Sequence, residues 1–190
     1  MKKILSIAFR LFFVCLICVA ALAGVNAVTA DKIAENEREE IQRALSQLIP
    51  DATYMPMTAQ NAGEEFSRID EAYIAYKGGE YAGCAVIIRA KGYGGDIALR
   101  VGFDASGGIA GIIVGSHSET PNLGAKITEE EFRGQFNGLK EQAVLRENIT
   151  PISGATISSA GVTEAVNTAR AYMDAYLEIF LKEGPAYGEA

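Results

Sequence analysis

The predicted sheet of this chain lies in residues 71–114, EAYIAYKGGEYAGCAVIIRAKGYGGDIALRVGFDASGGIAGIIV. Runs rich in Val, Ile and aromatic residues alternate there with short glycine-rich segments, a pattern typical of strands joined by turns. The runs lie at residues 72–76, 81–89, 96–103 and 109–114, and the turns at residues 77–80, 92–95 and 104–108. Because short turns join antiparallel neighbours, we predict an antiparallel meander of four strands.

Helical patterns flank this segment on both sides. From Ser159 onward, apolar residues recur every three to four positions, as in a helix that lies on a sheet, and Pro185 follows its end. Before the strands, residues 31–48 form an amphipathic helical pattern, and residues 63–67 fit a short helix. We therefore predict an α+β fold, a twisted antiparallel sheet flanked by helices.

The first thirty residues predict a transmembrane helix. Residues 11–30 carry no charge, and as a helix they span ~30 Å, the thickness of a bilayer core. Lys2, Lys3 and Arg10 precede this segment and favour a cytoplasmic N-terminus. A cleaved signal peptide is the alternative, because residues 25–27 resemble a cleavage site. The length of the apolar run favours a retained anchor in the cell membrane, crossing it once.

Five regions follow from these patterns. They are a cytoplasmic N-terminus at 1–10, a transmembrane anchor at 11–30, a helical connector at 31–70, an extracytoplasmic domain at 71–184 and a tail at 185–190. The chain has net charge −7, and the three basic residues before the connector account for all charge ahead of it. Residues 31–190 contain 14 basic and 24 acidic residues and therefore carry a net charge of −10. This acidic charge excludes nucleic acid as a partner.

The three cysteines predict no metal site. Cys15 and Cys18 form a Cys-x-x-Cys inside the apolar segment, where packing is the favoured interpretation and a share in a redox site between subunits is the alternative. Cys84 lies in a predicted strand and is expected to be buried and inert.

The segment ISGATISS at residues 152–159 carries the candidate chemistry. It is a loop of small residues that leads into a predicted helix, where free backbone N–H groups and the helix dipole attract a phosphate. From the pattern alone, simple helix capping is the favoured explanation of the same residues, and a phosphate site is the alternative. The candidate binding residues are Ser153, Gly154, Ala155, Thr156 and Ser158.

Ser153-Gly154-Ala155-Thr156, followed by a hydrophobic residue and Ser158, resembles the flavinylation motif of the FMN-binding domain family. That family includes the G subunit of the Rnf complex and the C subunit of the sodium-pumping NADH:quinone oxidoreductase. Residues 117–124, HSETPNLG, resemble the family's Glu-Thr-Pro-Gly-Leu-Gly loop, which lies beside the flavin. Two residues depart from the family pattern: Thr150 stands where an Asp is usual, and Asn122 replaces a Gly.

The resemblance implies a cofactor and a role. A flavin transferase would join the phosphate of FMN to Thr156, and Glu119, Thr120, Leu123 and Gly124 would form hydrogen bonds near the flavin ring. The chain would then be an electron-carrier subunit of a membrane ion-translocating ferredoxin:NAD oxidoreductase (Rnf) complex, working beside flavin and iron–sulfur subunits. The alternatives are a carrier like the C subunit of the quinone reductase and a non-redox membrane-anchored module whose motif only caps a helix. No catalytic residues are expected on this chain, so its standing as an enzyme depends on the complex.

Two other features have a structural interpretation. His117, the single histidine, is expected to be structural or solvated, with a redox-coupled role as the alternative. Tyr172 and Tyr176 are expected to belong to the core, with a stack on the flavin as the alternative.

Overall fold

The computed structural model describes residues 2–57 and 63–183 and divides into two compact units, residues 1–43 and 44–190. In chain order the helices are α1 (Lys2–Leu48), the 3₁₀ turn η1 (Glu64–Phe66), η2 (Gly124–Thr128), α2 (Glu130–Arg133), η3 (Gly134–Phe136) and α3 (Thr156–Glu183). The strands are β1 (Thr53–Pro56), β2 (Ile69–Lys77), β3 (Glu80–Lys91), β4 (Asp96–Asp104) and β5 (Ile109–Val114). The expected tail lies outside the described residues.

The first unit consists of α1 up to Arg43. Its segment Phe9–Asn26 is long and apolar enough to cross a membrane. Three phenylalanines cluster near the start of that segment, with ring centroids 5.7–6.5 Å apart. The helix continues without interruption through residues 31–48, as the amphipathic pattern predicted.

The second unit is built on a five-stranded antiparallel sheet in the order β1-β2-β3-β4-β5. The four predicted strands correspond to β2–β5, so the meander is confirmed. The sequence analysis missed β1, which pairs with β2 from Thr53 opposite Tyr76 to Pro56 opposite Tyr73. Four residues that end in proline are too few to show a strand period. This strand places residues 53–56, expected within the connector, in the folded unit.

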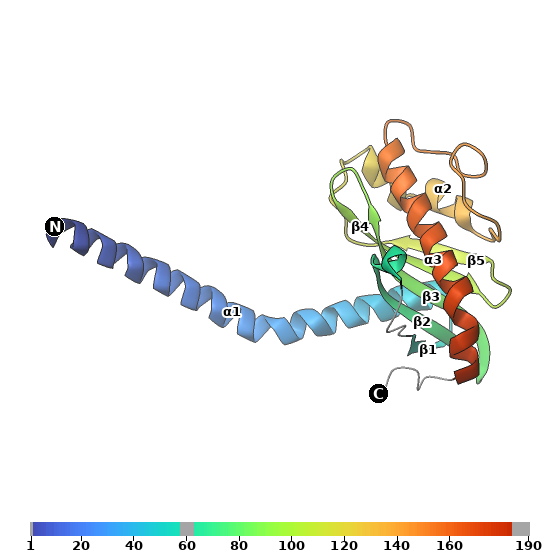
Figure 1. Cartoon of the computed structure of the whole chain (residues 1–190), viewed down its shortest axis with the longest axis horizontal. Helices are drawn as coiled ribbons and strands as arrows, with labels where there is room; N and C mark the ends of the chain where they lie inside the picture. Colours follow the sequence, from blue (N-terminus) through green and yellow to red (C-terminus); the bar gives the residue numbers. More distant parts are fainter. Residues whose placement is uncertain (1, 58–62, 184–190) are drawn as a thin grey trace. The chain divides into compact units, whose positions relative to one another are not determined.

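One face of the sheet packs against α3, which runs across β3 and β4 (Figure 1). The alternating residues of β3 and β4 supply the sheet side of this core: Cys84, Val86, Ile88, Ala90, Ile97, Leu99, Val101 and Phe103. The helix side comes from Val162, Val166, Ala169, Tyr172 and Met173. Burial of each large apolar side chain stabilises such a core by about 1.5–3 kcal/mol. The helical stripe predicted from the sequence is therefore the core-facing side of α3.

The other face of the sheet receives the last turn of α1. Gly102 and Gly111 pair across β4 and β5, and with Gly83 of β3 they form a surface that we name the glycine trough. A Cβ added at Gly102 would lie 2.9 Å from Leu48 Cβ, and one added at Gly83 would lie 2.7 Å from Ile49 Cδ1. The second compact unit, which begins at Ala44, therefore includes the last turn of α1.

Candidate functional site

Three loops meet at one edge of the folded unit and enclose a cavity of about 540 Å³, which we name the first cavity. They are the β3–β4 turn, the segment that follows β5 and the segment that leads into α3. The lining residues are Tyr93, Glu119, Thr120, Leu123, Gly124, Gly154, Ala155, Thr156, Ile157 and Ser158. Small-molecule sites in proteins usually occupy about 300–1,000 Å³, so the first cavity is of ligand size.

The entry to α3 is set by a tight turn. Gly154 has φ of +78°, which favours glycine, and Ala155 N donates to Ile152 O at 3.0 Å. Ser159 Oγ accepts from Ile152 N at 3.0 Å and donates to Ala155 O at 2.9 Å. This turn starts α3 at Thr156, three residues earlier than the apolar pattern indicated. Thr156 is thus in the first helical turn, whose N–H groups lack partners within the helix.

The hydroxyl groups of the motif differ in their environment. Ser158 and Ser159 are buried, and each donates its proton to a protein oxygen. Thr156 is exposed and lines the first cavity together with the exposed Thr120. The structure therefore leaves two threonine hydroxyls, from two different segments, at the surface of this cavity.

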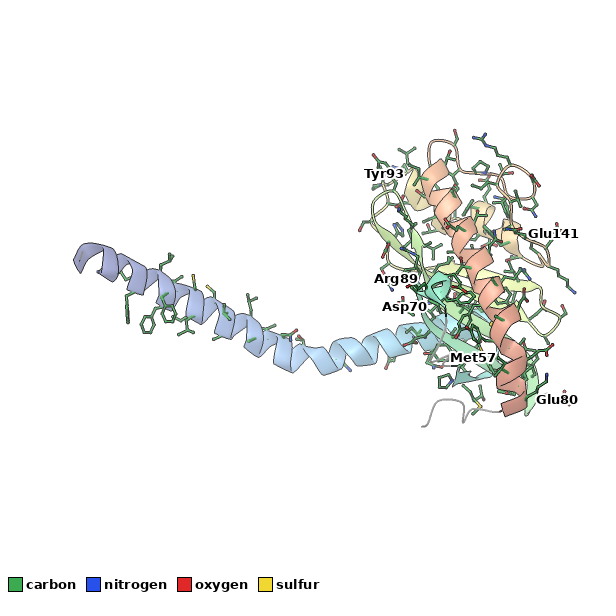
Figure 2. All side chains as sticks on the ribbon, viewed as in Figure 1. Met57, Asp70, Glu80, Arg89, Tyr93 and Glu141 are labelled. Atoms are coloured by element: carbon green, nitrogen blue, oxygen red, sulfur yellow. The ribbon has the colours of Figure 1, made fainter. Side chains whose placement is uncertain are left out.

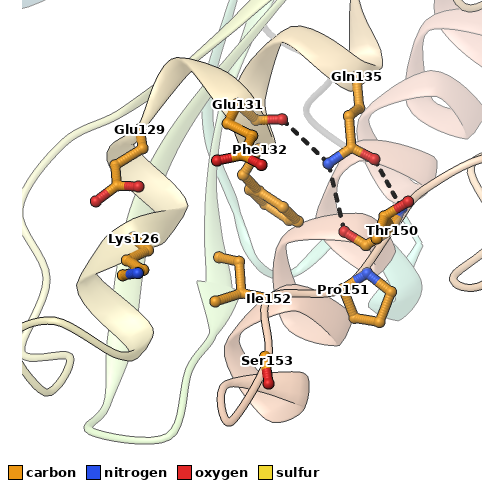
Figure 3. Close-up of a pocket in the computed structure, with 9 residues that line it drawn as sticks. All are labelled: Lys126, Glu129, Glu131, Phe132, Gln135, Thr150, Pro151, Ile152 and Ser153. Atoms are coloured by element: carbon orange, nitrogen blue, oxygen red, sulfur yellow. Dashed lines mark hydrogen bonds between the residues drawn. The ribbon is translucent and has the colours of Figure 1, made fainter.

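Ser153 is exposed and lines a second, neighbouring cavity of about 350 Å³ (Figure 3). Gln135 holds one wall of this second cavity: its Oε1 accepts from Thr150 N at 2.7 Å, and its Nε2 donates to Thr150 O at 3.3 Å. Thr150, which departs from the family pattern, is thus held by its backbone. Of the predicted cofactor-binding residues, Ser153 alone lies on the second cavity, and the other eight line the first.

Glu119 is buried, with 6% of its surface exposed. Its Oε1 accepts a hydrogen bond from Gly94 N at 2.9 Å, and its Oε2 accepts one from the Ser158 hydroxyl. The Glu119 N–H donates to His117 Nδ1 at 3.2 Å, which gives the lone histidine a structural partner in its own loop. The carboxylate therefore connects all three loops of the first cavity.

Glycines leave room for this carboxylate. A Cβ added at Gly92 would lie 2.2 Å from Glu119 Oε1, and one added at Gly124 would lie 2.2 Å from Glu119 Oε2. A Cβ added at Gly94 would lie 2.0 Å from Ser118 O. The glycine-rich break between β3 and β4 is thus required by close packing as well as by the turn.

The rim of the first cavity is apolar. Tyr93, Ile157 and Leu123 are 73%, 57% and 44% exposed, and Tyr93 projects from the edge of the folded unit (Figure 2). Among the described residues of the second unit, the exposed large hydrophobic side chains are these three and two near the end of α3. Exposed apolar groups that gather at a cavity indicate a ligand or partner with apolar surface.

The remaining predicted features have clear positions. Tyr172 is buried in the core, with its ring centroid 4.9 Å from that of Tyr176 and 5.4 Å from that of Phe66. Tyr176 is partly buried and packs against the same core, as expected. Asn122 has φ of 60°, the left-handed conformation that asparagine tolerates. Cys84 is buried, and burial raises the pKa of its thiol to about 12.

Sequence reasoning missed Tyr93 and Ile157 as cavity residues. Both stand next to the small residues that were singled out, Tyr93 within the glycine run and Ile157 after Thr156. An apolar side chain in a turn of glycines has no strand or helix face to occupy, and this could have indicated its exposure.

Comparison with known proteins identifies the family. A family model described as the FMN-binding domain matches residues 92–171, and one described as the RnfG N-terminal region matches residues 1–48. The G subunit of the proton-translocating ferredoxin:NAD(+) oxidoreductase complex of Clostridium ljungdahlii is 30% identical over 178 residues, which are 88% of this chain and 90% of that protein. The chain belongs to the G-subunit family of ion-translocating oxidoreductase complexes.

A second G subunit matches over a similar length. The G subunit of the ion-translocating oxidoreductase complex of Shewanella baltica is 34% identical over 185 residues, 87% of each chain. The solved C subunit of the Na(+)-translocating NADH-quinone reductase of Parabacteroides distasonis is 20% identical, with a TM-score of 0.47 over 64% of this chain and 75% of that one. The matched FMN-binding region contains every residue of the first cavity.

Proposed function

We propose that this member of the G-subunit family carries one FMN, esterified through its phosphate to Thr156, and acts as an electron carrier in a membrane ion-translocating ferredoxin:NAD oxidoreductase complex. The observation that carries the proposal is the exposed Thr156 hydroxyl in a ligand-sized cavity, inside the region that matches the FMN-binding domain. Ser158 is a poorer acceptor because its hydroxyl is buried and bonded to Glu119.

The first turn of α3 suits a phosphodiester. Its unpaired N–H groups and the positive end of the helix dipole stabilise a negative charge placed beside Thr156. Gly154 and Ala155 add little bulk, so a nucleotide can approach the backbone. Ser153 opens on the adjacent cavity and offers a further hydroxyl to the phosphate side of the loop.

The apolar rim suits the flavin ring. Tyr93, Leu123 and Ile157 offer apolar surface, while Thr120 and Gly124 line the same cavity with polar groups. FMN, when bound, supplies reversible one- and two-electron transfer, and the protein positions the ring and tunes its potential. A covalent link at Thr156 would keep the cofactor on a domain outside the cytoplasm.

The membrane segment supports the same role. Lys2, Lys3 and Arg10 precede Phe9–Asn26 or lie at its start, which favours a cytoplasmic N-terminus and an extracytoplasmic second unit. The electron donor and acceptor would be flavin and iron–sulfur subunits of the complex, and a flavin transferase would attach the FMN.

A gel and a mass measurement test the bond. We would produce the full chain with the flavin transferase and compare Thr156→Val with Thr120→Val, which removes the other exposed hydroxyl of the cavity. The wild type and Thr120→Val should fluoresce at the position of the 20.2 kDa chain after boiling and gain the mass of FMN less one water. Thr156→Val should do neither.

The alternatives give different results. An unmodified wild type would leave a non-redox anchored module with a capped helix. Fluorescence that persists in Thr156→Val would move the acceptor to Thr120 or Ser158. A carrier like the C subunit of the quinone reductase would pass the same test, and isolation of the native complex with its other subunits separates the two.

The orientation has its own test. Glu141 is exposed on the second unit (Figure 2), so we would label Glu141→Cys in intact cells with a membrane-impermeant maleimide. Labelling before cell lysis supports an extracytoplasmic domain, and labelling that requires lysis contradicts it.

A further inference from the structure

Glu119 stands apart from the other acidic residues of this chain. Where the structure describes side-chain burial, it is the one buried carboxylate, and both of its oxygens accept hydrogen bonds from the protein. Gly94 belongs to the β3–β4 turn and Ser158 to the first turn of α3, so the two bonds reach two different segments. A buried carboxylate requires such partners, because burial of an unpaired charge is strongly unfavourable.

Two glycines, Gly92 and Gly124, pack closely against the carboxylate of Glu119. Gly92 and Gly124 approach it so closely that an added Cβ would lie 2.2 Å from one of its oxygens. The same Cβ at Gly124 would lie 2.9 Å from Ser158 Oγ. Glu119 is thus enclosed by the three segments that form the first cavity, and its oxygens face protein groups.

We propose that Glu119 is a positioning residue that fixes the first turn of α3, and with it Thr156, against the β3–β4 turn that carries Tyr93. It acts through Gly94 and Ser158 rather than through the flavin ring. The inference rests on the proposed function, in which Thr156 carries the FMN. Without Glu119, the first turn of α3 and the β3–β4 turn would lose the side chain that hydrogen-bonds to both.

Glutamine and alanine at this position make opposite predictions. In Glu119→Gln, the amide oxygen can accept from Gly94 N–H while the amide nitrogen donates to Ser158 Oγ, so both links persist with reversed polarity at Ser158. In Glu119→Ala, both links are lost: the Gly94 N–H loses its protein acceptor, and the buried Ser158 hydroxyl is left without a partner. A positioning role is therefore retained by glutamine and lost with alanine.

Hydrogen exchange of the full chain in nanodiscs measures these links without any flavin. In protein made without the transferase, Glu119→Ala should exchange about tenfold faster than wild type in peptides that cover residues 92–95 and 156–163. Glu119→Gln should stay within about twofold of wild type in both peptides. Glu129→Ala, at an exposed glutamate near the same region, is the matched control and should change neither peptide.

Ser158→Ala separates the two links and serves if Glu119→Ala fails to fold. It should raise exchange at residues 156–163 and leave residues 92–95 protected, because Gly94 keeps its bond to Glu119. In protein made with the transferase, Glu119→Ala should also lower both the flavinylated fraction and the fluorescence anisotropy of the attached flavin.

Each outcome supports or overturns the linkage. Unchanged exchange in Glu119→Ala, or an equal rise in the glutamine variant, would overturn the positioning role. If Ser158→Ala raised exchange equally in both peptides, a link that runs separately to each segment would be refuted. A wild type that gains no flavin, together with fast exchange in Glu119→Ala, would refute the proposed function and leave the linkage intact.

Discussion

Gly161→Ala tests how tightly α3 is seated on the sheet beside the first cavity. Gly161 lies five residues after Thr156, over the last residue of β3. A Cβ added there would lie 1.9 Å from Lys91 O and 2.8 Å from Lys91 C. Both are backbone atoms, so no side-chain rotation can relieve the clash.

The magnitude follows from this geometry. The contact must open from 1.9 Å to at least 3.0 Å, a movement of about 1.1 Å between α3 and the end of β3. Overpacking costs about 1–3 kcal/mol, and a clash with backbone atoms, which cannot rotate away, lies in the upper part of that range, at about 2–3 kcal/mol. Alanine offsets about 1 kcal/mol of that because it is the better helix former. We expect a net loss of about 1–2 kcal/mol and a melting temperature lower by roughly 2–8 °C.

The sign of the change makes this a sharp test. Helix propensity alone predicts that alanine stabilises α3, whereas the contact with Lys91 predicts destabilisation. Calorimetry of the full chain in nanodiscs measures the melting temperature. Glu164→Ala, at an exposed position one turn further along α3, is the control and should stay within about 0.5 kcal/mol of wild type. A Gly161→Ala protein that melts higher than wild type would refute the close seating of α3.

Four further predictions concern the rest of the second unit. Cys84 should resist maleimide at pH 9 in native protein whose two membrane-segment cysteines are replaced by serine, because burial raises the pKa of its thiol to about 12. Rapid labelling of Cys84 would contradict its burial. In the folded state the Cys84 thiol keeps its proton at pH values above its ordinary pKa of 9.0. The stability that this thiol contributes is therefore present below pH 9 and falls as the pH rises through about 12. Cys84→Ala should flatten that fall in melting temperatures measured over a series of pH values. The hydroxyl of Ser106 holds the pKa of Asp104 below its ordinary 3.8. This carboxylate therefore stabilises the fold above pH 3.8, and the effect is lost on acidification through the lowered pKa. Ser106→Ala should raise the pKa of Asp104 in an NMR titration, and an unchanged pKa would assign the shift to the backbone N–H donors. Gly102→Ala should destabilise the unit by about 1–3 kcal/mol, because the added Cβ would lie 2.9 Å from Leu48 Cβ, and an unchanged melting temperature would show that the last turn of α1 yields freely.

The meander could be predicted from the sequence because its turns carry their own signals. The turn between β2 and β3 contains Gly78 and Gly79, both with positive φ, so each strand boundary was marked by local chemistry. The four residues of β1 carry no such mark. They form a strand because β2 offers a free edge, which is a tertiary cause that a local pattern does not contain.

The candidate site was only partly visible in the sequence. The small-residue loop and Thr156 could be found, since a helix entry follows from local residue types. The burial of Glu119 could not, because a glutamate in a loop is ordinarily exposed and its partners lie 25 and 39 positions away in the chain. The start of α3 at Thr156 likewise depends on the hydroxyl of Ser159, which bonds to the preceding turn.

The glycine trough limits where this protein can be cut. Leu45 and Leu48 lie in the last turn of α1 and Ile49 directly follows it, and all three are buried in the second unit. A cut on the C-terminal side of these residues, by a protease or in an engineered truncation, would remove them together with the anchor. The apolar surface of β3, β4 and β5 that they cover would then be exposed. A soluble fragment suited to spectroscopy should therefore retain at least one helical turn upstream of Ala44, and a cleavage in the cell that spares this turn would release the domain still folded.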